Sequence, residues 1–139
     1  MTINEIQDEI IEEFSSMDEW FDRYAYIIDL GNEMPEAPES LKVPDNKIDG
    51  CQSDVWIDAH VDDEGLLQFE ATSNSSIVKG IAALLVRALS GHKPQEVVDA
   101  DLYFIDRIGL GSHLSPTRSN GLLAMLKRMR AYALAFSNA

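Results

Sequence analysis

The residue with the clearest capacity for chemistry is Cys51, the only cysteine among the 139 residues of the chain. A lone thiol cannot close an internal disulfide, and it cannot supply the several thiolates of a structural zinc or iron–sulfur site. The sequence therefore predicts no metal site in this chain. Any sulfur chemistry at Cys51 needs a second molecule.

The residues around Cys51 predict that its sulfur is presented at a bend. Gly50 permits a turn or a positive φ, and the two residues that follow the cysteine, Gln52 and Ser53, are polar. A thiol in a bend can meet another molecule. The alternative is a structural cysteine, because free cysteine is among the most buried residue types and usually packs as a small hydrophobe.

The charges near Cys51 predict a thiol with little activation of its own. Asp49 and Asp54 bring negative charge close to the sulfur, and no Lys or Arg lies within three positions downstream. Nearby negative charge disfavours the thiolate, which is the reactive form. Activation is therefore expected from a partner, or from residues that are distant in sequence and fold over the loop.

Two other classes of function stay open on the residues alone. A Cys–His thiol enzyme would use Cys51 with His60, His92 or His113 as its base, although no recognisable nucleophile signature surrounds the cysteine. A non-catalytic protein-binding module would keep Cys51 as a structural residue and dock a basic partner on acidic helices. Replacement of Cys51 would abolish sulfur chemistry and leave such a module intact.

The composition is that of one globular domain over residues 1–139, since 45% of the residues are hydrophobic and 25% are charged. The net charge of −13 is unevenly spread. Residues 1–70 carry 20 acids and 3 bases, a balance of −17, and residues 71–139 carry 4 acids and 8 bases, a balance of +4. An acidic surface repels phosphate backbones and anionic lipids, so nucleic-acid and membrane-surface functions are disfavoured.

The opening residues predict a cytoplasmic protein. They carry early acids where a leader peptide would have a basic region followed by an apolar stretch, and no apolar run approaches the length of a membrane span. A single unpaired cysteine is in keeping with a reducing compartment.

The first part of the chain is predicted to hold two amphipathic helices. Thr2 and Glu5 form a capping-box signature before the first, and Trp20 begins the apolar face of the second, which Gly31 is expected to end in a left-handed conformation. Three prolines among acids then predict an extended surface segment over residues 32–46.

A β-hairpin is predicted after Cys51. Apolar and polar residues alternate over 55–61 and again over 67–72, with turn residues at 63–65 between them. Residues 47–49 allow a short additional strand, which would leave Cys51 in the loop that enters the hairpin. A sheet this small needs a layer of helices over its apolar face.

The rest of the chain is predicted to be helical. The expected helices cover residues 77–88, a short segment from Pro94 to Val98, residues 102–108, and a last helix that begins at Ser115-Pro116 and runs to Phe136. Residues 109–113 interrupt the pattern, and Met125 and Met129 are expected in the core. The fold class is therefore α+β, a small antiparallel sheet packed against helices.

Three runs of sequence, in this order, resemble the SufE and CsdE family of sulfur acceptor proteins. They are Gly50-Cys51-Gln52-Ser53-Asp54-Val55-Trp56, Ile77-Val78-Lys79-Gly80 and His113-Leu114-Ser115-Pro116-Thr117-Arg118-Ser119-Asn120-Gly121-Leu122. The resemblance covers nearly the whole chain. It implies a SufE-like fold, similar to that of U-type iron–sulfur scaffolds. Residues 72–76 depart from the family pattern, in which acids are frequent there.

The resemblance implies that Cys51 accepts persulfide sulfur from a PLP-dependent cysteine desulfurase of the SufS or CsdA kind. The chain would stimulate that enzyme and deliver the sulfur to an iron–sulfur scaffold or another acceptor. It would be an accessory sulfur-transfer protein rather than an independent enzyme. It would carry no cofactor of its own, because the PLP belongs to the desulfurase. A SufE role and a CsdE role are not separated by the sequence.

The resemblance also supplies supporting residues. Arg118 lies in the first turn of the last helix, where it can steady a thiolate or persulfide or pair with an acid of the extended segment. His113 can hydrogen-bond near the sulfur or order the turn before that helix. Gln52 and Ser53 are expected to shape the loop rather than to take part in the chemistry.

Overall fold

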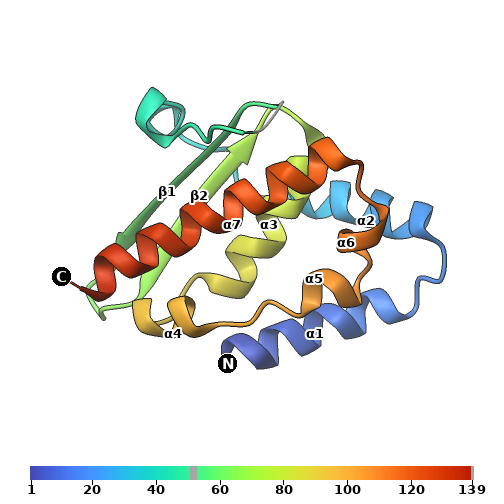
Figure 1. Cartoon of the computed structure of the whole chain (residues 1–139), viewed down its shortest axis with the longest axis horizontal. Helices are drawn as coiled ribbons and strands as arrows, with labels where there is room; N and C mark the ends of the chain where they lie inside the picture. Colours follow the sequence, from blue (N-terminus) through green and yellow to red (C-terminus); the bar gives the residue numbers. More distant parts are fainter. Residues whose placement is uncertain (51–52, 139) are drawn as a thin grey trace.

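The computed structural model describes residues 1–50 and 53–138, without the side chains of residues 116–118. Its elements, in chain order, are α1 (Ile3–Ser15), α2 (Trp20–Glu33), η1 (Glu39–Leu41), η2 (Pro44–Asn46), β1 (Val55–Val61), β2 (Leu67–Ser73), α3 (Ser76–Leu89), α4 (Pro94–Asp99), α5 (Phe104–Arg107), α6 (Leu110–His113) and α7 (Pro116–Ser137). In Figure 1, α7 lies along the hairpin of β1 and β2, and α1 and α2 lie on the side of α3 away from the hairpin. Among the described helices, none has the length and apolar character required to cross a bilayer.

The hairpin is the one predicted from the period-two pattern. Strands β1 and β2 pair antiparallel, with Val55 opposite Ser73 at the open end and Val61 opposite Leu67 at the turn end. The predicted strand at residues 47–49 is reduced to a single bridge between Lys47 and Trp56. Together with the helices around it, this sheet confirms the α+β class.

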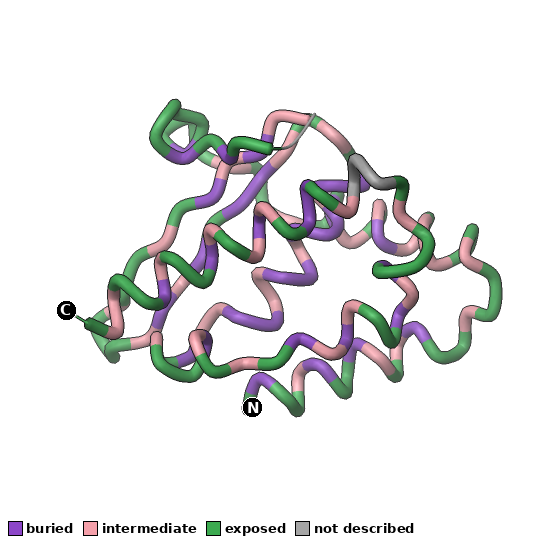
Figure 2. Tube along the Cα trace, viewed as in Figure 1, coloured by how far each residue is buried: buried purple, intermediate pink, exposed green. Residues whose placement is uncertain are grey.

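Helix α3 lies at the centre of the hydrophobic core. Its neighbours are β2, α1, α2 and α7, and Figure 2 shows that buried residues concentrate on this helix and on the facing side of α7. The N-cap of α3 is Ser75, whose hydroxyl accepts a hydrogen bond from the amide of Val78. Met125 and Met129 of α7 are fully buried against this core, as predicted.

Gly31 does not end α2, contrary to the sequence prediction. It is buried inside the helix, which continues to Glu33, and it faces Gly80 of α3. A Cβ at Gly31 would lie 2.7 Å from the amide nitrogen of Gly80, and a Cβ at Gly80 would lie 2.0 Å from the carbonyl oxygen of Ile27. Both glycines are therefore present because two helix backbones touch here, and only a hydrogen atom fits between them.

Two other predicted segments differ in the structure. The segment 32–46 is not extended throughout, because η1 and η2 form single turns that bury Leu41 and Asn46. The predicted helix 102–108 is shorter and is followed by a second turn of helix. Gly109, with a φ of 92°, separates α5 from α6, and α6 then includes residues expected to be irregular. A left-handed glycine stops one helix without preventing the next.

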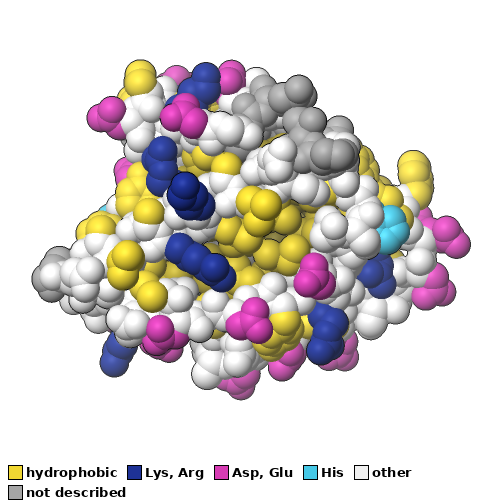
Figure 3. All heavy atoms as spheres, viewed as in Figure 1, with side chains coloured by type: hydrophobic (Ala, Val, Ile, Leu, Met, Phe, Trp, Pro, Cys, Tyr) yellow, Lys and Arg dark blue, Asp and Glu magenta, His cyan; other side chains and the backbone are white. Residues whose placement is uncertain are grey.

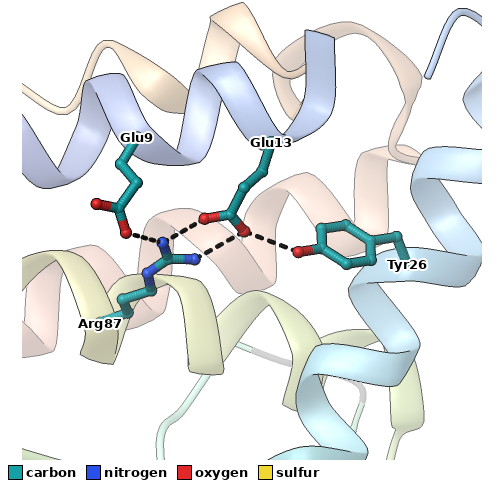
Figure 4. Close-up of polar contacts among 4 residues, drawn as sticks. All are labelled: Glu9, Glu13, Tyr26 and Arg87. Carbon is teal, nitrogen blue, oxygen red and sulfur yellow. Dashed lines mark hydrogen bonds and ion pairs between the residues drawn. The ribbon is translucent and has the colours of Figure 1, made fainter. Parts of the chain in front are cut away.

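A polar network joins α1, α2 and α3 (Figure 4). Arg87 donates to both carboxylate oxygens of Glu13 and, at 2.6 Å, to Glu9. The hydroxyl of Tyr26 donates to Glu13 at 2.7 Å, and burial together with this carboxylate raises the pKa of Tyr26 to about 12. The Arg87 hydrogen bond holds the pKa of Glu13 below its ordinary value of 4.5. The network therefore fixes α1 against α3 most firmly while Glu13 is ionised.

We expect Gly80→Ala to destabilise the protein. Alanine in a helix normally stabilises it by up to about 1 kcal/mol relative to glycine, but here the added methyl group would overlap the backbone of α2 at Ile27. Overpacking of this kind costs about 1–3 kcal/mol. Thermal or urea unfolding measures the change.

The matched control is Gly111→Ala, because its Cβ would meet only the exposed carboxylate end of Asp106, which can move aside. Equal stability of Gly80→Ala and the wild type would show that α2 and α3 do not touch at these glycines.

We expect Glu13→Gln to lower the free energy of unfolding by about 1 kcal/mol at pH 7, because the partly exposed bidentate pair with Arg87 is lost. Glu13 has a lowered pKa in the folded state, so its contribution is complete above the ordinary value of 4.5 and disappears as the pH falls through the folded pKa. The difference between the variant and the wild type should shrink below pH 4.5.

Urea unfolding over a pH series checks this, with the exposed Glu12→Gln on the same helix as control. A difference that stays constant down to the acid limit would contradict an ionic origin.

Candidate functional site

Cys51 and Gln52 lie outside the described residues, and the site is built here from the residues that flank them. Gly50, directly before the cysteine, has a φ of 91°, which agrees with the turn predicted there. A Cβ at Gly50 would lie 3.8 Å from the Cβ of Ala124 in α7. The left-handed turn that precedes Cys51 therefore lies close to the last helix.

The two ends of the loop from residue 48 to residue 54 are joined to each other. The amide of Ile48 donates to the carbonyl of Val55 at 2.9 Å. The ammonium group of Lys47 lies 3.0 Å from the carboxylate of Asp54, with both side chains nearly half exposed. The loop that contains Cys51 is therefore closed at its base by a backbone bridge and an ion pair.

The exit of the loop is bound to the start of α3. The amide of Asp54 donates to the side-chain oxygen of Asn74 at 3.0 Å, and the side-chain nitrogen of Asn74 donates back to the Asp54 carboxylate at 3.3 Å. The amide of Asn74 and the hydroxyl of Ser73 both donate to the Asp54 carbonyl. Ser53, the predicted loop-shaping residue, is half-buried directly before this contact.

Asn74 was not singled out by sequence reasoning. It appeared only within residues 72–76, where the chain departs from the family pattern. An asparagine after a predicted strand is typical of a turn, and that signal is present. Its partner Asp54 lies 20 residues away in the sequence, and local sequence does not reveal such a pairing.

Helix α7 supports the loop with residues spaced four apart. After Ala124 beside Gly50, Arg128 donates to the carbonyl oxygens of Asp45 and Lys47, each at 3.2 Å. One turn further, the hydroxyl of Tyr132 donates to the carbonyl of Ile57. One face of α7 thus follows the loop and the first strand.

Two helices begin close to this loop. The first residues of α3 follow Asn74 directly, and Figure 1 shows the start of α7 next to the start of α3 at the open end of the hairpin. Arg118 is the third residue of α7, and six residues separate it from Ala124, which is about 9 Å along a helix. Helix N-termini carry partial positive charge, so this end of the molecule favours anions.

The structure reduces the net negative charge that the sequence predicts around the loop. Of the two acids expected to suppress thiolate formation, Asp54 is paired with Lys47 and hydrogen-bonded to Asn74. Its negative charge is therefore partly balanced within the loop itself. The partial positive charge at the two helix N-termini acts in the same direction.

His113 contacts the first residue of α2 and the glycine that precedes α6. It is exposed, it stacks on Trp20 with ring centroids 4.6 Å apart, and its Nδ1 lies 3.0 Å from the carbonyl oxygen of Gly109. The same Nδ1 lies 3.1 Å from the hydroxyl of Ser112. Of the two predicted roles for His113, these contacts match the ordering of the turn.

The other two histidines lie at the turn end of the hairpin. His60 is opposite Gln68 and five residues beyond Val55, which is about 17 Å along a strand. His92 forms a bridge with Leu67, and its Nε2 lies 3.0 Å from the carbonyl of Met1. Gly50 and Ser53 are near the open end. The described geometry therefore does not support a Cys–His pair built with either of these histidines.

Within the described part of the chain, no group of three or more His, Asp or Glu side chains is arranged to hold a metal ion.

The sequence of the chain is similar to a known family and to several relatives. The profile of the family described as "SufE: Fe-S metabolism associated domain" matches residues 8–133. An uncharacterized SufE-like protein of Rhizobium meliloti is 41% identical over 130 residues, covering 91% of this chain and 93% of the relative. A similar protein of Rhizobium etli is 40% identical, covering 91% of this chain and 88% of the relative.

A solved structure has the same fold. It is the solution structure of a hypothetical protein from Thermus thermophilus, with a TM-score of 0.77 and 23% sequence identity. The match covers 96% of this chain and 97% of that one. At this level of identity the likeness concerns the fold alone.

We expect Asn74→Ala to loosen the exit of the Cys51 loop. The substitution removes two side-chain hydrogen bonds to Asp54 and leaves the backbone contact between the two residues. Amide hydrogen exchange in peptides that span residues 48–55 should become faster, and global stability should fall by about 1 kcal/mol.

The control is Asn32→Ala, an exposed asparagine on α2. Unchanged exchange in the loop peptides would mean that Asn74 does not hold the loop.

Proposed function

Because the chain belongs to the SufE family, whose domain is associated with Fe–S metabolism, we propose that it is a sulfur carrier. It receives sulfur on Cys51 from a cysteine desulfurase, stimulates that enzyme, and passes the sulfur to an iron–sulfur scaffold or another acceptor. The observation that carries this proposal is the position of the chain's only cysteine. Cys51 falls inside the matched family region and inside a loop whose two ends are held against α3 and α7.

The transfer step exchanges one sulfur–sulfur bond for another. The Cys51 thiolate attacks the outer sulfur of a cysteine persulfide on the desulfurase. A new S–S bond forms at Cys51, the original S–S bond breaks, and the desulfurase thiolate leaves and can take up the proton lost by Cys51. No net oxidation or reduction occurs. The PLP that liberates sulfur from free cysteine belongs to the desulfurase.

The rate of this step depends on the fraction of Cys51 that is thiolate and on access to it. The partial positive charge at the starts of α3 and α7 supports thiolate and persulfide anions near the loop, and pairing with Lys47 offsets part of the Asp54 charge. Asp49 opposes them. We propose that the docked desulfurase activates the Cys51 thiol.

The supporting residues take separate roles in this proposal. Arg118, in the first turn of α7, steadies the thiolate or persulfide. Gln52 and Ser53 shape the loop, and His113 orders the turn before α7 through Trp20 and Gly109. Only Cys51 forms and breaks bonds.

We expect a gain of about 32 Da, one sulfur atom, when the purified chain is incubated with a cysteine desulfurase and cysteine. Intact mass spectrometry measures the gain, which should be removed by reductant and absent from Cys51→Ser. Arg118→Ala should accumulate the modified form more slowly than Arg118→Lys, because the lysine retains the positive charge.

The absence of any gain with several desulfurases would overturn the carrier function and favour a binding module. A gain that persists in Cys51→Ser would assign the modification to another residue and contradict the role of Cys51.

A further inference from the structure

The outer face of α7 carries a stripe of two leucines and two basic residues. Leu123, Lys127, Arg130 and Leu134 follow one another at intervals of four, three and four residues, which places them on one side of the helix. Leu123 is 63% exposed and Leu134 is 52% exposed, although leucine gains stability from burial. Figure 3 shows hydrophobic side chains in the middle of this face with Lys and Arg beside them.

An apolar cavity of about 300 Å³ opens next to Leu123. Its apolar walls are Leu102 and Ile105, near α5, and Leu122, Leu123 and Leu126 on α7. The exposed carboxylate of Asp106 lies at its rim. A cavity with these walls accepts an aliphatic or aromatic side chain from another molecule.

The basic residues of α7 are not paired with described carboxylates. Among the described side chains, no carboxylate lies within ion-pair distance of Lys127, Arg128 or Arg130. In the described part of the chain, the hydrogen bonds donated by Arg128 and Arg130 go to the backbone carbonyl oxygens of Asp45, Lys47 and Ala100. A net-positive face on a chain of charge −13 is complementary to an acidic surface and selects against basic ones.

We propose that this stripe, with the cavity beside it, is the surface on which the cysteine desulfurase docks. This inference rests on the proposed function and adds the location and chemistry of the contact. The desulfurase surface that covers α7 presents carboxylates to Lys127 and Arg130 and one apolar side chain to the cavity at Leu123.

The position of the stripe near the Cys51 loop is the reason for assigning it to the desulfurase. A Cβ built at Gly50, the residue before Cys51, would lie 3.8 Å from the Cβ of Ala124, which follows Leu123 in α7. A partner that transfers sulfur to Cys51 must cover this loop, and a stable interface takes about 800 Å² from each protein. A footprint of that size centred near the loop extends over the exposed face of α7.

The test is the dependence of Cys51 persulfide formation on carrier concentration, with a fixed amount of desulfurase at low and at high salt. For Lys127→Glu/Arg130→Glu we expect the half-saturating concentration to rise about tenfold or more, and its salt dependence to reverse. The rate at saturation should stay within about twofold of the wild type, since the substitutions leave the loop intact. Leu123→Asp should raise the half-saturating concentration at both salt levels.

The matched control is Lys93→Glu. Lys93 is exposed at the start of α4, whereas Arg130 contacts Ala100 at the other end of that helix. The control should keep the wild-type half-saturating concentration. Thermal unfolding confirms that each variant is folded.

The outcomes separate the docking surface from the proposed function. Wild-type kinetics in the double variant, while the wild type itself accepts sulfur, would overturn the docking surface and leave the proposed function standing. A wild type that accepts no sulfur would overturn the proposed function and the docking assignment with it. A wild-type dimer in sedimentation that the double variant dissociates would make the occupant a second copy of the chain and also overturn the proposal.

Discussion

The contact between α2 and α3 at Gly31 and Gly80 is the constraint on which the rest of the structure depends. Because only hydrogen atoms lie between these backbones, α2 can press against one side of α3 while the hairpin covers the other. Helix α3 is then buried along most of its length. An alanine-sized side chain at this crossing would separate the layers, and the hairpin and α7 would lose the surface against which they pack.

The candidate site follows from that arrangement, since its loop has no core of its own. Asp54 is bound to Asn74 just before α3, and the carbonyl of Lys47 is bound by Arg128 of α7. The loop is therefore positioned by two helices that are themselves positioned by the core. The residues that flank Cys51 are thus held by elements of the rigid scaffold.

Local sequence was sufficient for features that depend on neighbours in the chain. The Thr2 and Glu5 cap, the alternation of the hairpin and the left-handed turn at Gly50 all involve residues within a few positions of each other. Local sequence was insufficient where one residue type has two structural roles. Glycine serves both left-handed turns and close backbone approach, so Gly31 was assigned the wrong one. Asn74 was missed for a related reason, because its partner is determined by the tertiary fold.

The fold shows where part of the unevenly distributed charge of the chain lies. The first half has a balance of −17 and the second half +4, and α7 carries three of the second half's bases, Arg128 beside the Cys51 loop and Lys127 and Arg130 on its outer face. The acidic remainder repels phosphate and anionic lipid. The basic face differs in charge from the rest of the chain. It attracts an acidic protein surface although the chain as a whole is not positively charged. If the desulfurase docks on this face as proposed, the same charge distribution favours an acidic partner and disfavours basic ones.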